Sequence, residues 1–82
     1  MRNYRVMLDI SNVFPRIRHL FLKIYNSPFP TVFVNADNPD EACFTALNDL
    51  INIIIKQNSD ISMRLVCREI IKKSRIDKIE EL

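Results

Sequence analysis

The sequence predicts an α+β fold, a two-layer sandwich in which two helices cover one face of a small mixed sheet. Three observations indicate it: apolar and polar residues alternate near the N-terminus, a well-capped helix occupies the middle of the chain, and an amphipathic helix precedes a final strand. With 82 residues, of which 48% are hydrophobic and 27% charged, the chain has room for one core. Residues 1–82 are therefore expected to form a single domain.

Two strands are expected in the first third of the chain. In residues 4–10 every second side chain is apolar, which is the period of a half-buried strand. Residues 17–25 allow two interpretations, because their apolar residues fit both a strand and a helical stripe at positions 17, 20, 21 and 24. The strand is preferred, since β-branched and aromatic residues are frequent there and the short gap after the first strand suits a hairpin.

The middle of the chain carries the clearest start signal for a helix. Prolines make residues 26–30 a loop, and residues 31–36 alternate as a short strand. Asp37 or Asn38 can then cap a helix that begins at Pro39, and acidic residues in its first turn favour the positive end of the helix dipole. A helix over residues 39–57 is predicted, with an apolar face too broad for a single neighbour.

A second helix and a last strand complete the expected order. Residues 58–60 offer a capping region, and the following apolar residues share one helical side until about Ser74. Residues 75–80 are then expected to form a strand. The order is β-β-β-α-α-β, and a right-handed crossover through both helices favours parallel pairing of the third and last strands.

The composition excludes several classes of site. Glycine is absent, and P-loops, dinucleotide-binding turns, nucleophile elbows and standard EF-hands all need glycine. Two cysteines and one histidine are too few for a structural zinc site or for a disulfide framework. No metal or cofactor is therefore expected, and the compartment is expected to be the cytoplasm. No apolar run is longer than three residues, the length of Ile53 to Ile55, so no membrane span is expected.

For each candidate catalytic group, a structural role is favoured over a catalytic one. Cys43 and His19 are the only plausible nucleophile and base, but Cys43 lies on the apolar side of its helix, as Cys67 does on the next. Whether the two cysteines meet is left open. Helix capping explains the acids at positions 37, 40 and 41 better than metal binding does. No catalytic residue is assigned, and the protein is expected not to be an enzyme.

Basic residues form the most suggestive surface feature. They lie within one side of the second helix and its C-terminal end: Arg64, Arg68, Lys72 and Arg75. Such a stripe can neutralise phosphates, with Arg16 and Arg18 as supplements, although a solvated helix face is the favoured alternative. The formal net charge is only +2, and no aromatic RNA-binding motif accompanies the stripe.

Apolar residues are candidates for a protein interface. Phe29 lies in a stiff proline loop. Phe44 and Ile55 lie at the edge of the apolar arc of the first helix, and the expected surface also includes Ile51 of the apolar face. An exposed apolar patch of this kind marks an interface with a partner or with a second copy.

These patterns favour a small non-enzymatic interaction protein, an adaptor, inhibitor or regulator that binds another protein or itself. The alternative is a nucleic-acid-binding regulator that uses the basic stripe. Twelve isoleucines and eight asparagines indicate an AT-rich genome, and an accessory protein of a bacteriophage fits both size and composition.

Overall fold

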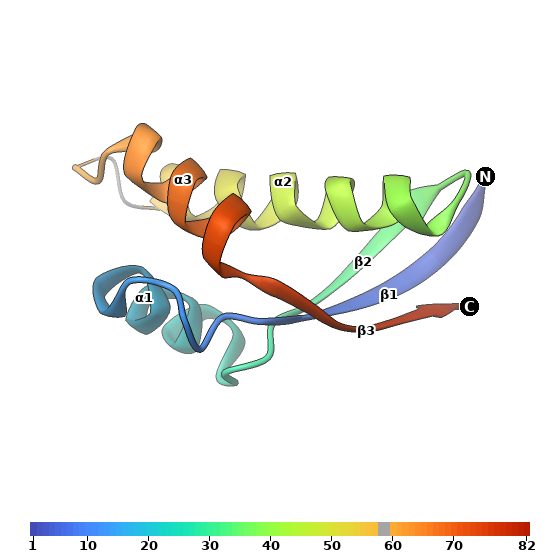
Figure 1. Cartoon of the computed structure of the whole chain (residues 1–82), viewed down its shortest axis with the longest axis horizontal. Helices are drawn as coiled ribbons and strands as arrows, with labels where there is room; N and C mark the ends of the chain where they lie inside the picture. Colours follow the sequence, from blue (N-terminus) through green and yellow to red (C-terminus); the bar gives the residue numbers. More distant parts are fainter. Residues whose placement is uncertain (58–59) are drawn as a thin grey trace.

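Helices pack over one face of a three-stranded antiparallel sheet (Figure 1), in a computed structural model that describes residues 1–57 and 60–82. The elements in chain order are β1 (Arg2–Asp9), α1 (Pro15–Tyr25), β2 (Thr31–Ala36), α2 (Pro39–Gln57), α3 (Met63–Lys73) and β3 (Arg75–Glu81). The α+β class expected from the sequence is confirmed.

The sheet has the order β2-β1-β3, and β1 pairs antiparallel with both neighbours. Tyr4 of β1 lies opposite Val34 on one side and Glu81 on the other. The parallel pairing expected between residues 31–36 and the last strand does not form, because β1 lies between them. Since β2 and β3 both run antiparallel to β1, they still point in the same direction.

The strand preferred for residues 17–25 is wrong, and this segment belongs to helix α1. The helix begins at Pro15 and ends before Asn26, whose left-handed backbone (φ 53°) lets its N–H donate to the Leu22 carbonyl. Helical geometry buries Ile17 and Phe21 on one side. A strand would instead have placed a charged or polar side chain among the apolar ones on either face.

Capping explains where the other helices begin. The Asn38 side-chain oxygen accepts a hydrogen bond from the Glu41 N–H (2.9 Å), as the sequence predicts for the start of α2. For α3, the N-cap is Ser62, whose Oγ accepts from the Leu65 N–H at 3.3 Å. Of the capping region expected at residues 58–60, Asn58 and Ser59 lie outside the described residues.

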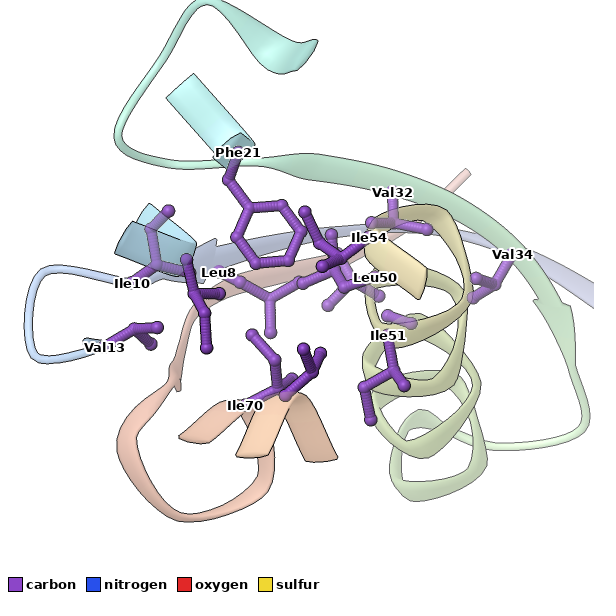
Figure 2. Packing of buried hydrophobic residues seen from close by; sticks show 14 of the residues in the cluster. Leu8, Ile10, Val13, Phe21, Val32, Val34, Leu50, Ile51, Ile54 and Ile70 are labelled. Carbon is purple, nitrogen blue, oxygen red and sulfur yellow. The ribbon is translucent and has the colours of Figure 1, made fainter. Parts of the chain in front are cut away.

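The core lies between the sheet and the helices. Every second side chain of β1 is buried (Tyr4, Val6 and Leu8), and Figure 2 shows Leu8 in one cluster with Phe21 of α1, Ile54 of α2 and Ile70 of α3. The 19 residues of α2 make it about 28 Å long. The six residues of β2 span only about 20 Å. The helical layer therefore extends past one end of the sheet, and α1 lies beneath it there (Figure 1).

Candidate functional site

Phe44 heads an apolar ridge on one side of α2. We define the α2 ridge as Phe44, Ile51 and Ile55, which the helical period places within a narrow arc because they are spaced seven and four residues apart. Exposure differs along it: Phe44 is 67% exposed, Ile51 is 6% exposed, and Ile55 is half-buried against the core. Ile51, expected at an interface, therefore belongs to the core of its own chain.

Helix α3 explains why Ile51 and Ile55 are less exposed than Phe44. It packs against α2 and runs back along its C-terminal half, and in Figure 2 Ile51 lies on the flank of α2 nearer to α3. The helix ends at Lys73, where the chain descends into β3 (Figure 1). No described element covers the N-terminal half of α2 on this side, and Phe44 is exposed to solvent there.

Phe29 is not part of the same surface. It is 39% exposed in the loop between α1 and β2, where Pro30 is buried and the Phe29 N–H donates to Ser27 Oγ at 3.1 Å. Figure 1 shows this loop on the side of the strands away from α2. The structure thus separates two aromatic residues that the sequence analysis grouped as interface candidates.

The basic side of α3 consists of three side chains one turn apart, Arg64, Arg68 and Lys72. All three are exposed, and no ion pair in the described part of the chain engages them. Ile71 is 62% exposed and lies beside this arc, about 20° beyond its edge at Arg64. The surface therefore combines unpaired positive charge with one apolar side chain. We call Arg64, Arg68 and Lys72 the α3 basic face.

Arg75 of the expected stripe and the two supplementary arginines, Arg16 and Arg18, lie near other groups of the chain. Arg75 is the first residue of β3 and lies opposite Asp9 of β1. The pKa of Asp9 is lowered mainly by hydrogen bonding to Ser11, with Arg75 contributing less. Arg16 is 3.4 Å from the Asp60 carboxylate, and Arg18 donates to the Ser11 carbonyl at 2.8 Å. Arg16 and Arg75 thus have a carboxylate nearby and Arg18 contacts a backbone carbonyl, whereas no described ion pair engages the α3 basic face.

Cys43 and His19 do not form a catalytic pair. His19 is exposed on α1 at one end of the molecule, whereas Cys43 lies near the start of α2 at the other end (Figure 1). Burial, and then the charge of Asp40, raise the pKa of the Cys43 thiol, which disfavours the nucleophilic thiolate. Both Cys43 and Cys67 are free, half-buried thiols.

The acidic residues at the start of α2 are solvent-exposed. Asp37, Asp40 and Glu41 surround the helix N-terminus that Asn38 caps. Within residues 1–57 and 60–82, no group of three or more His, Cys, Asp or Glu side chains is arranged to hold a metal ion.

Two residues that the sequence analysis did not single out occupy distinctive positions. Phe33 is 66% exposed on the face of the sheet that no helix covers, directly opposite Arg5. The sequence does carry a signal for this exposure. Phe33 lies between Val32 and Val34, and a strand that buries one face presents its alternate side chains to solvent. Glu69 is 9% exposed on α3 and accepts a hydrogen bond from the Phe14 N–H at 2.8 Å. No sequence pattern signals that contact, because the two residues are far apart in the chain.

The described surface has no pocket, and no described helix has the length and apolar character needed to cross a bilayer. Comparison of the chain with protein-family models, curated proteins and solved structures finds no match. The candidate sites are therefore the exposed surfaces described above.

Proposed function

We propose that this protein is a small non-enzymatic interaction protein, an adaptor, inhibitor or regulator, that binds another protein through the uncovered end of the α2 ridge. The observation that carries the proposal is the exposure of Phe44 on the same side of α2 on which α3 buries Ile51. Helix α3 already packs against this side of α2 along the C-terminal half of α2. A partner segment can continue that packing where α3 stops.

The energetics favour this position over scattered exposed residues. Burying one large apolar side chain contributes about 1.5 to 3 kcal/mol, and aromatic residues are enriched among the residues that dominate interface energies. Phe44 is anchored on a 19-residue helix whose buried side contacts the core, so little conformational entropy is lost when it docks. The occupant expected here is an apolar helix or loop of another protein.

The test compares two phenylalanines of nearly equal exposure. Affinity capture from cells that express the gene is done with the wild type, with Phe44→Glu and with Phe33→Glu as the matched control on the sheet. We expect at least one protein that the wild type and the control recover equally and that Phe44→Glu recovers on the order of tenfold less, the loss for about 1.4 kcal/mol. Identical recovery by all three proteins contradicts binding through Phe44.

A second candidate function is nucleic-acid binding through the α3 basic face. The observation that favours it is the absence of any described ion pair at Arg64, Arg68 and Lys72, which leaves them available to phosphates. Counterion release gives a log-affinity slope of about −0.9 per neutralised phosphate on duplex DNA, so three contacts give roughly −2.7.

Salt titrations with duplex DNA test this candidate. The double variant Arg68→Ala/Lys72→Ala should flatten the slope by about 1.8 and weaken binding similarly for all sequences. Arg16→Ala is the matched control, because Arg16 already faces Asp60. Absence of binding at low salt, or an unchanged slope in the double variant, rules this function out.

A further inference from the structure

Strand β2 forms one edge of the sheet, and its hydrogen-bonding pattern shows which backbone groups face outward. The Leu8 N–H donates to the Pro30 carbonyl at 3.0 Å, in line with the β1–β2 register. Residues alternate between facing β1 and facing away along an antiparallel strand. Val32, Val34 and Ala36 therefore face β1. The backbone N–H and C=O groups that point away from the sheet belong to Thr31, Phe33 and Asn35.

These outward groups form a short, bounded ladder. No backbone hydrogen bond between described residues engages the outward N–H groups of Thr31, Phe33 or Asn35. On the N-terminal side the ladder stops at Phe29, whose N–H is already bonded to Ser27, and on the C-terminal side the strand ends at Ala36. The open edge is therefore three outward residues long.

The two edges of the sheet differ in their charge. Strand β3 carries charged side chains at five of its seven positions, which are Arg75, Asp77, Lys78, Glu80 and Glu81. Strand β2 has the sequence TVFVNA and carries none. Natural sheets use charges, prolines or bulges to protect exposed edges from pairing with other strands. The β3 edge has such protection, and the residues of β2 itself have none.

We propose that a second copy of this chain pairs with the β2 edge, antiparallel, with Phe33 opposite Phe33 of the other copy. In this register Thr31 of each copy lies opposite Asn35 of the other, and all three outward residues of both copies are paired. Each hydrogen-bonded pair exchanges two bonds, so about six form across the interface. Shifting the register by two residues leaves some outward groups unpaired.

This register is compatible with a symmetric dimer for two further reasons. The same patch meets itself around a two-fold axis through the Phe33 pair, which is the geometry of an isologous contact. No like charges oppose each other on β2, and the two exposed Phe33 rings come together as a cross-strand aromatic pair. The three strands of each copy then join into one continuous six-stranded sheet. Binding of another protein through Phe44 does not depend on this pairing.

Sedimentation equilibrium over a range of concentrations tests the dimer, with Phe33→Glu as the disrupting variant. Phe33 has 66% exposure and a side chain on the uncovered face, so the substitution leaves the monomer folded, which far-UV circular dichroism checks. We expect a wild-type dimer whose dissociation constant rises on the order of 100-fold in Phe33→Glu, because two carboxylates then lie opposite each other. Phe44→Glu, at nearly equal exposure, should leave the dimer intact.

A second variant removes a hydrogen bond instead of adding a charge. Asn35→Pro deletes an outward N–H that no backbone hydrogen bond between described residues uses, and it should also weaken the dimer. In a Cys43→Ser/Cys67→Ser background, Phe33→Cys should form an intermolecular disulfide on mild oxidation, because paired Cα atoms lie about 5.5 Å apart. A wild type that stays monomeric at high concentration overturns the proposal, as does a dimer that Phe44→Glu dissociates and Phe33→Glu does not.

Discussion

Glu69 joins two helices through one charged side chain. Its carboxylate, only 9% exposed, accepts the Phe14 N–H at the N-terminus of α1. That end of α1 has no side-chain cap of its own and no acidic residue in its first turn. A carboxylate supplied by α3 satisfies one of the unpaired N–H groups there and lies at the positive end of the helix dipole.

Replacing Glu69 tests this role. We expect Glu69→Ala to lower the free energy of unfolding by about 1 to 3 kcal/mol, because a partly buried N–H loses its acceptor. Glu69→Gln keeps an oxygen acceptor and should cost clearly less. Urea denaturation followed by circular dichroism measures both, and equal stability of Glu69→Ala and wild type would show that the contact contributes nothing.

Glu80 is the residue whose titration the structure predicts most directly. Its pKa is lowered first by a hydrogen bond from Lys78, whose Nζ is 2.6 Å from one carboxylate oxygen, and then by one from Arg5. Because the folded-state pKa lies below the unfolded value, the stabilisation is present above the unfolded pKa and is lost as pH falls through the folded one.

A carboxyl-carbon NMR titration should therefore give Glu80 a midpoint below that of an ordinary glutamate. Lys78→Gln removes the largest cause and should move the midpoint upward. Lys72→Gln, on the exposed side of α3, serves as the control and should not move it. An ordinary midpoint in the wild type would contradict the ion pairs described for this face of the sheet.

Among the elements, helix α1 shows that the secondary structure of a short apolar segment depends on the segments that pack around it. Residues 17–25 fit a strand and a helix about equally as a pattern. The helix places Ile17 and Phe21 in the core and leaves His19 and Lys23 exposed. It also fills the space beneath the part of α2 and α3 that extends past the strands (Figure 1).

The position of Phe21 in the core gives a test of this arrangement. Phe21→Ala should lower the free energy of unfolding by about 3 to 5 kcal/mol, because it removes a fully buried ring and leaves a cavity. Phe44→Ala, on an exposed helical position, should change it by less than about 0.5 kcal/mol. Thermal or urea unfolding measures both, and comparable losses in the two variants would contradict the assigned burial.

At the scale of the whole molecule, β3 closes the fold by pairing the last residues with the first strand. Deleting residues 75–82 leaves β1 and β2 as a two-stranded pair, which is marginal on its own, and removes Ile79 from the edge of the core. We expect the truncated chain to lose its cooperative thermal transition.

Leu82→Ala is the control for that truncation. Its side chain is 64% exposed, and the substitution retains the backbone N–H that donates to the Asn3 carbonyl at 2.7 Å. This variant should melt as the wild type does. A cooperative transition in the truncated chain at an unchanged temperature would show that β3 does not contribute to the fold.

Local patterns in the sequence were sufficient for the elements with strong signals. Alternation identified β1, and the residues from Asn38 to Glu41 identified the start of α2, because capping depends only on neighbours in the chain. The basic residues of α3 could be placed on one helical side from their spacing. The exposure of Phe44 follows partly from the same arithmetic, since it lies at the edge of the apolar arc.

Local patterns along the chain were thus enough to predict the α+β class, helices α2 and α3, and the residues that could form surfaces. Contacts between distant segments were needed to show that residues 17–25 are helical and that β1 separates β2 from β3. The same holds for the burial of Ile51 but not Phe44, and for the position of the uncharged strand β2 at an edge of the sheet. The physical reason is range. Helix caps and apolar periodicity depend on residues that are close together in the chain. Strand adjacency and burial depend on which distant segments pack together.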